Sequence, residues 1–183
     1  MKNIIFEDEH ILVVYKPAGI ATQTARIGQQ DMVSEIKNYL AKKPEQRGKG
    51  EPYLGIVHRL DQPVSGILVF AKTKQAAAEL SRQITGGKMQ KYYYAVIYGA
   101  PKQEQGRLEN YLYKDAKTNQ SLVVKEGFPD AKKAVLYYKL IKKLLVLGEN
   151  TGFEDYKANA SSREISLVEI KSVSYTHLRA HET

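Results

Sequence analysis

The stretch that most constrains the fold of this chain is V-H-R-L-D-Q-P-V-S-G-I-L-V-F, at residues 57–70. Apolar runs at residues 54–57 and 67–71 predict two buried strands on either side of a polar connection. The connection contains two turn-forming pairs, Gln-Pro and Ser-Gly, because proline fixes φ and glycine tolerates positive φ. The pattern therefore predicts a rigid loop at a sheet edge, which holds together His58, Arg59 and Asp61.

This loop contains one carboxylate, Asp61, two residues after Arg59. An opposite charge held beside a carboxylate favours its anionic form, which suits a nucleophile or a base better than an acid. The same spacing also fits an ordinary turn with a surface ion pair between Arg59 and Asp61, and residue types alone leave both interpretations open.

The whole string at residues 58–66, H-R-L-D-Q-P-V-S-G, closely resembles the H-R-L-D-x-x-T-S-G signature of the RluA-type pseudouridine synthases. Val64 stands where threonine is usual. The resemblance implies that Asp61 is the catalytic nucleophile. It also implies that Arg59 lies beside the nucleophile and helps to hold a flipped nucleotide.

Two further motifs resemble the same family. V-Y-K-P-A-G at residues 14–19 is similar to its K-P-x-G element, and K-Y-Y-Y-A-V-I-Y-G at residues 91–99 is similar to its K-x-Y-x-A-x-V-x-G strand. This register implies that Tyr93 is the active-site tyrosine that contacts the target base. Tyr92 and Tyr94 should point to the opposite face and pack there. We place Lys16 and His58 with Arg59 among the substrate-binding residues, and expect His58 to be a hydrogen-bonded structural histidine rather than a base or a metal ligand.

The rest of the chain predicts many strands and few helices. Asp31 is a candidate N-cap for a helix that extends to about residue 43. Thr73 is a candidate N-cap for a second helix over residues 74–84, which should end at Gly86-Gly87. Strands are predicted at residues 4–6, 11–15, 91–98, 106–113, 121–125, 134–147 and 164–171, with a turn at 148–152. We expect an α+β fold with a mixed, mainly antiparallel central sheet and flanking helices, as in the pseudouridine synthase catalytic domain, incomplete at the C-terminus.

The resemblance fails at the end of the chain. After a strand like L-V-E-I-K at residues 167–171, the family continues T-G-R-x-H-Q-I-R-x-H, whereas residues 172–181 are S-V-S-Y-T-H-L-R-A-H. We therefore expect a catalytic-type domain over residues 1–171 and an atypical, non-native tail at 172–183. The Gly-Arg pair of the family motif is absent from these residues. In the family that arginine pairs with the catalytic aspartate, so its loss predicts weak activity.

Composition agrees with an anionic partner. The net charge of +8 and the 13 tyrosines favour RNA, since tyrosine offers stacking faces as well as hydroxyl donors. The chain contains no cysteine, which excludes disulfides and thiolate metal sites and suggests the cytoplasm. His177 and His181, four residues apart, are a weak metal signal without a nearby acid, and we expect no metal. Without a signal peptide or an apolar run of about 20 residues, a soluble monomer away from membranes is expected.

The expected function is isomerisation of uridine to pseudouridine in ribosomal or transfer RNA, which needs no cofactor. One alternative is a truncated, inactive homologue that only binds RNA. A glycoside-processing hydrolase is another, although most of these use two carboxylates and no second acid lies near Asp61 in sequence. The polar loop at residues 41–53 is the expected carrier of substrate choice.

Overall fold

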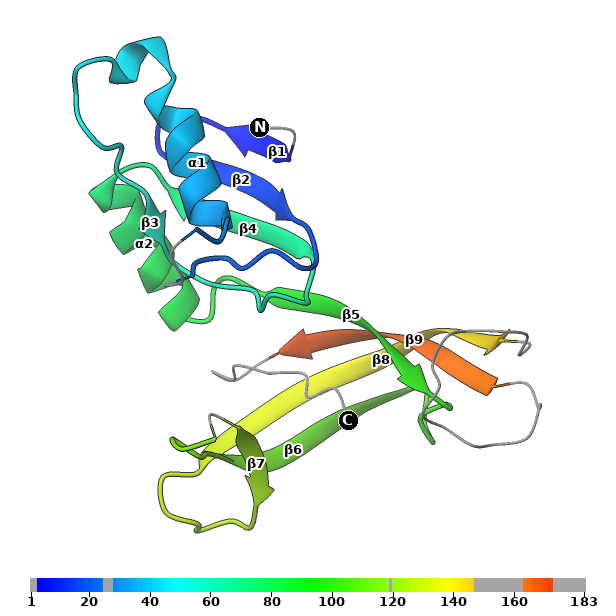
Figure 1. Ribbon diagram of the computed structural model, residues 1–183. Coiled ribbons are helices and arrows are strands. Elements are labelled where there is room, and N and C mark those ends of the chain that lie inside the picture. Colours follow the sequence, from blue (N-terminus) through cyan, green and yellow to red (C-terminus); the bar gives the residue numbers. More distant parts are fainter. Residues whose placement is uncertain (1–2, 25–27, 119, 147–162, 173–183) are drawn as a thin grey trace. The chain divides into compact units, whose positions relative to one another are not determined.

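A computed structural model describes residues 3–24, 28–118, 120–146 and 163–172 of the chain (Figure 1). The chain divides into two compact units, Met1–Met89 and Gln90–Thr183. Each unit has its own antiparallel sheet, and each is described here by itself. The predicted turn at residues 148–152 and the tail after Ser172 lie outside the described residues.

The first unit is built on a four-stranded sheet with the order β1-β2-β4-β3. All of its neighbouring strands are antiparallel, and β2 pairs with β4 along its whole length. The predicted hairpin at the N-terminus and the two strands around the Asp61 loop are thereby confirmed. The strand bounds are β1 Ile4–Glu7, β2 Ile11–Lys16, β3 Gly55–Ile56 and β4 Gly66–Ala71.

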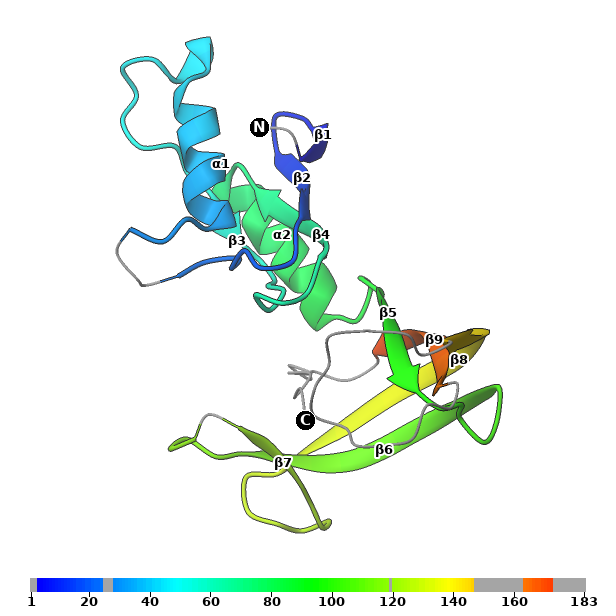
Figure 2. The ribbon, with the colours of Figure 1, turned by 45° about the vertical axis from the view of Figure 1, so that its right-hand side comes forward.

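Helix α1, Met32–Ala41, covers one face of this sheet (Figures 1 and 2). Its predicted N-cap is confirmed, because the Asp31 side chain accepts a hydrogen bond from the Ser34 N–H at 2.7 Å. Apolar side chains at helical spacing then meet those of β2 and β4. The resulting core consists of Leu12, Val14, Met32, Val33, Ile36, Leu40, Leu54, Leu68 and Phe70.

Helix α2, Lys74–Thr85, begins at the predicted cap Thr73, whose hydroxyl accepts from the Ala76 N–H at 3.1 Å, and it ends at Gly86. It approaches the sheet closely at Gly55, where an added Cβ would lie 3.0 Å from the Ala77 Cβ. Since Gly55 directly precedes Ile56, a partly buried β3 residue that packs against this core, and strand residues alternate between faces, α2 lies on the face opposite α1. A short 3-10 helix, η1 Pro44–Gln46, lies within the polar loop after α1.

The second unit contains a five-stranded antiparallel sheet with the order β5-β9-β8-β6-β7. Its central strand β8 is long, as the β-rich run in the sequence predicts. No helix belongs to this unit among the residues that the structure describes. The strand bounds are β5 Lys91–Tyr98, β6 Gln105–Lys114, β7 Ser121–Val124, β8 Lys132–Val146 and β9 Arg163–Ser172.

Strand β5 alternates between half-buried and exposed residues along its whole length. Tyr93 is on the half-buried face and Tyr92 and Tyr94 are on the other, as predicted. On that face Tyr92 lies against the Lys171 ammonium and the Tyr94 hydroxyl donates to Glu169, both on the neighbouring strand β9, while the two tyrosines are 52% and 67% exposed.

The α+β class predicted from the sequence is confirmed. The described strands form two separate antiparallel sheets, and an isolated parallel bridge joins Ala21 to Asp31. No described helix is long and apolar enough to cross a membrane.

Candidate active site

The loop with Asp61 joins β3 to β4 and contains the predicted turn. The Val64 N–H donates to the Asp61 carbonyl at 3.1 Å, which closes the turn around Gln62 and Pro63. Asp61 is half-buried here, whereas Arg59 is exposed. The backbone of Asp61 is therefore fixed by the turn, and its carboxylate lies at the boundary between protein and solvent.

Thr22 fixes the residue before Asp61. Its hydroxyl donates to the Leu60 carbonyl at 2.8 Å and accepts from the Leu60 N–H at 3.1 Å. Thr22 is buried, with 3% of its surface exposed, so water does not compete well for these bonds. One side chain thus satisfies both backbone groups of Leu60 and sets the position of the chain as it enters Asp61.

Gln62, on the other side of Asp61, is held by the K-P-A-G turn. The Gly19 N–H donates to the Gln62 carbonyl at 2.8 Å, and the Gln62 side-chain amide donates to the Gly19 carbonyl at 2.9 Å. Gly19 has a φ of 87°, in the region that favours glycine. Two of the motifs predicted from sequence are therefore bound to each other directly.

Lys16 supports the same turn from inside the protein. Its side chain is fully buried, and Nζ donates to the carbonyls of Ile20 at 2.7 Å, Pro17 at 3.0 Å and Gln62 at 3.2 Å. Burial lowers the pKa of Lys16, and the negative charge of Asp61 opposes that shift. Because Nζ donates to three carbonyls, it is an ammonium group, and its charge interacts with that of Asp61.

Arg59 has a different partner from the one that its spacing suggested. Its Nη2 donates to the Gln23 side-chain carbonyl at 3.0 Å. Over the described residues no ion pair joins Arg59 to Asp61, so the simple surface-pair interpretation of the loop was wrong. The exposed guanidinium reaches across to the segment after the K-P-A-G turn.

His58 is a hydrogen-bonded structural histidine, as the sequence analysis expected. Its Nε2 accepts from the Val69 N–H of β4 at 3.1 Å, so this nitrogen carries no proton. The bond ties the start of the loop to the strand that follows it.

Tyr93 belongs to the second unit. It lies on the half-buried face of β5 and pairs in register with Ile170 of β9. The position of this tyrosine is therefore set by the alternation of the strand, as predicted.

Thr22 and Gln23 were not identified from the sequence. They lie in a short extended segment with no hydrophobic periodicity, and their partners, Leu60 and Arg59, are 38 and 36 residues away. Only their place immediately after the K-P-A-G turn could have indicated a role. The predicted substrate-binding residues Lys16, His58 and Arg59 are all brought to the Asp61 loop, although the first is buried.

Residues of metal-binding type do not gather in the part of the chain that the structure describes: no group of three or more His, Cys, Asp or Glu side chains could hold an ion there. His177 and His181 lie outside the described residues.

Known proteins that are similar to this chain share one family. The family model for RNA pseudouridylate synthase matches residues 10–181. The chain is 38% identical over 145 residues to ribosomal large subunit pseudouridine synthase D of Zymomonas mobilis, covering 78% of this chain and 44% of the relative. It is 34% identical over 109 residues to the dual-specificity RNA pseudouridine synthase RluA of Vibrio parahaemolyticus, covering 58% of this chain and 39% of the relative. The chain belongs to the RNA pseudouridylate synthase family.

Solved structures support the fold. Human RNA pseudouridylate synthase domain containing 4 superposes with a TM-score of 0.66 at 20% identity, covering 96% of this chain and 60% of that structure. Human RNA pseudouridylate synthase domain containing 1 superposes with a TM-score of 0.65 at 18% identity, covering 95% of this chain and 60% of that structure. The chain spans less than half the length of the curated relatives named above.

Proposed function

We propose that this chain isomerises uridine to pseudouridine within RNA, and that Asp61 acts on the ribose. The observation that carries the proposal is the position of Asp61: the residues on both sides of it are held by Thr22 and Gly19, while its side chain reaches the protein surface. A carboxylate whose backbone cannot move is the arrangement expected for a group that must meet one carbon atom of a substrate. Family membership supplies the reaction class.

The proposed reaction breaks the bond between N1 of uracil and C1′ of ribose, turns the base, and joins C5 to C1′. C5 loses a hydrogen and N1 gains one, so the product is an isomer, and no cofactor or metal is needed. Asp61 acts either by attack at C1′ or by removing the proton at C2′. Tyr93 contacts the base, and its hydroxyl takes part in proton transfer at C5.

The neighbours of Asp61 have different roles in the proposed reaction. Arg59, exposed and held by Gln23, binds the backbone of the extruded nucleotide. Lys16 and His58 act as positioning residues, because the contacts described above join them to the backbone of the loop. Extrusion of a stacked base costs a few kcal/mol, which phosphate contacts elsewhere on the protein can offset.

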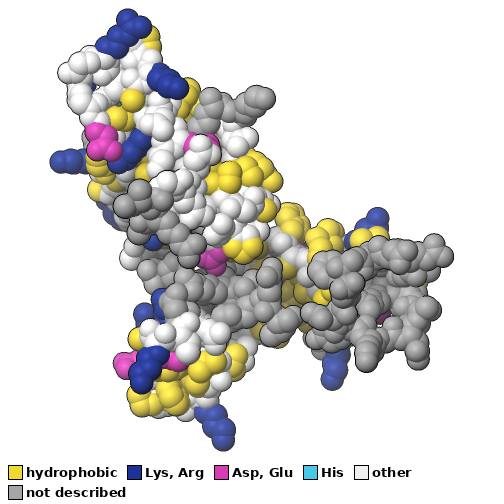
Figure 3. Space-filling view, in the orientation of Figure 1, with side chains coloured by type: hydrophobic (Ala, Val, Ile, Leu, Met, Phe, Trp, Pro, Cys, Tyr) yellow, Lys and Arg dark blue, Asp and Glu magenta, His cyan; other side chains and the backbone are white. Residues whose placement is uncertain are grey.

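The loop at residues 41–53 supplies candidates for such contacts. Its exposed cations Lys42, Arg47 and Lys49 lie beside α1 and η1, where Figure 3 shows Lys and Arg side chains at the surface. We propose that this loop helps to choose the RNA, that the substrate is ribosomal or transfer RNA, and that the protein acts as a cytoplasmic monomer.

The proposal is tested with RNA that carries tritium at C5 of its uracils, since formation of pseudouridine releases this hydrogen to water. We expect release with the wild-type chain and none with Asp61→Asn. Asp130→Asn is the matched control, because Asp130 is exposed and has a φ of 59°, a backbone conformation that asparagine also tolerates.

Three other outcomes would contradict the proposal. Equal release by wild type and Asp61→Asn would exclude Asp61. Salt-dependent RNA binding without any release would identify a non-catalytic RNA-binding homologue. Free uracil in the products would identify a glycoside hydrolase instead of an isomerase.

A further inference from the structure

Four side chains form a row across the sheet of the second unit, on the face opposite Tyr93. Tyr92 of β5 pairs with Lys171 of β9, Lys171 pairs with Tyr137 of β8, and Tyr137 pairs with Arg107 of β6. Residues paired in register across antiparallel strands point to the same face, so aromatic rings and cations alternate along this row.

The row is accessible. Tyr92 and Tyr137 are 52% and 45% exposed, the Arg107 side chain is 48% exposed, and Lys171 is half-buried. The Lys171 ammonium lies 5.6 Å from the centre of the Tyr92 ring, within the range of a cation–π contact. The aromatic face of Tyr92 is therefore held next to a positive charge at the surface.

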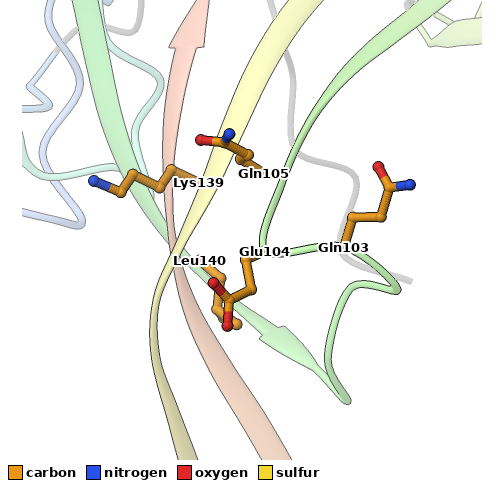
Figure 4. A pocket seen from close by; sticks show the side chains of 5 residues that line it. All are labelled: Gln103, Glu104, Gln105, Lys139 and Leu140. Carbon is orange, nitrogen blue, oxygen red and sulfur yellow. The ribbon is translucent and has the colours of Figure 1, made fainter.

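A second row lies beside the first. It runs from Tyr94 through Glu169 and Lys139 to Gln105. Lys139 and Gln105 line a cavity of about 500 Å³ at the start of β6, together with Gln103, Glu104 and Leu140 (Figure 4). The amide groups in this cavity offer both donors and acceptors next to the aromatic row.

Charge on this face favours an anion. Across both rows and the neighbouring positions of this face, the cations Lys171, Arg107, Lys139 and Lys133 outnumber the carboxylates Glu169 and Glu109. Glu169 accepts a hydrogen bond from the Tyr94 hydroxyl at 3.0 Å, and Glu109 forms ion pairs with Arg107 and Lys133, which leaves Lys171 and Lys139 as the cations nearest to Tyr92 and Tyr94. Aromatic rings interleaved with cations are the arrangement with which proteins bind single-stranded nucleic acid, because bases stack on the rings and phosphates meet the cations.

We infer that this face, defined by Tyr92, Lys171, Tyr137 and Arg107, binds a single-stranded RNA segment other than the target uridine. Tyr92 and Tyr137 lie two strands apart, or about 10 Å, so two bases can stack while Lys171 faces the phosphate between them. The inference rests on the proposed RNA substrate, and it adds a second contact surface to that of the Asp61 loop.

The test measures binding of a fluorescent oligouridylate of about 12 nucleotides to the full chain, over a series of salt concentrations. Tyr92→Leu with Tyr137→Leu removes both rings and keeps every charge. We expect affinity to fall about 30-fold, which is the smallest loss expected when two bases lose their stacking partners. The salt dependence of the affinity should not change. Lys171→Gln with Arg107→Gln should lower the slope of log affinity against log salt by about 1.4.

Tyr98→Leu is the matched control. Tyr98 is on the same face of β5 and is more exposed, at 76%, but it pairs with Ile165 rather than with a cation. We expect its substitution to leave affinity unchanged. Circular dichroism and thermal unfolding of every variant exclude loss of fold as the cause of a change.

Wild-type affinity in the double tyrosine variant would overturn the inference, and tritium release that depends on Asp61 would then leave the proposed function standing. If instead the wild-type chain released no tritium but the double tyrosine variant lost affinity, the RNA-binding surface would be supported and the proposed isomerase activity would be contradicted. The chain could also dimerise in a concentration-dependent way that the tyrosine changes abolish while RNA affinity stays intact. That result would assign the face to a second copy of the chain and overturn the inference.

Discussion

The hydroxyl of Thr22 bonds both backbone groups of Leu60, at 2.8 Å to the carbonyl and 3.1 Å to the N–H. Leu60 immediately precedes Asp61, so this buried side chain determines where the carboxylate lies. The segment after the K-P-A-G turn is therefore part of the site, although it carries none of the residues that the sequence motifs point to.

Thr22→Val keeps the shape of the side chain and removes both hydrogen bonds. We expect the free energy of unfolding to fall by about 1–3 kcal/mol, because two backbone groups lose their partner in a buried place. Tritium release at saturating RNA should fall as well, since Asp61 loses its support. Urea unfolding and the release assay measure the two effects, and Thr22→Ser, which keeps the hydroxyl, should restore most of both. Equal losses in the valine and serine variants would contradict a role for the hydroxyl.

Gly19→Ala tests the turn that holds Gln62. A Cβ at Gly19 would meet no atom within 4 Å, so its cost comes from the backbone alone, at a φ of 87°. We expect a loss of about 1–2 kcal/mol in stability, measured by urea unfolding. Gly28→Ala is a suitable control for backbone strain, because Gly28 has a φ of 81° and also has open space around it. Both variants should be destabilised, but only Gly19→Ala should reduce tritium release.

Glu7 gives the first unit a measurable pH dependence. Burial alone would raise the pKa of Glu7, but hydrogen bonds from Lys43, Lys72 and Tyr39 outweigh it and hold the pKa at about 2. Because this value is below the ordinary 4.5, the stabilisation is complete above pH 4.5 and is lost as the pH falls towards 2.

Glu7→Gln should accordingly be less stable than wild type at pH 7, by about 2–3 kcal/mol. The difference should shrink as the pH falls from 5 towards 2, because the wild-type carboxylate becomes protonated over that range. Urea unfolding at a series of pH values measures it. Glu51→Gln is the control, since Glu51 forms an exposed ion pair with Lys37. A constant difference at all pH values would show that Glu7 does not titrate as described.

The sequence predicted those parts of the structure that depend on local signals. Asp31 and Thr73 cap helices because a side-chain oxygen at that position satisfies a free N–H, and the alternation of β5 places Tyr92 and Tyr93 on opposite faces. The partner of Arg59 could not be predicted, because Gln23 meets it only after the chain has folded back over 36 residues. The exposure of Tyr92 could not be predicted either, because the sequence of a strand does not show whether another layer covers it.

Lys16→Met removes the positive charge near Asp61 while keeping a side chain of similar size, so it tests the effect of the charged group apart from that of the side chain's bulk. Methionine fills a similar volume but leaves three carbonyls without their donor, those of Ile20, Pro17 and Gln62. We expect a loss of about 2–3 kcal/mol in the free energy of unfolding, the usual range for hydrogen bonds to a charged group. Tritium release should fall more than the unfolded fraction accounts for, because Asp61 loses both its nearby positive charge and the support of Gln62. RNA affinity should stay at the wild-type value, since Lys16 is buried. If affinity fell and release per bound RNA did not, Lys16 would be a substrate contact rather than a positioning residue.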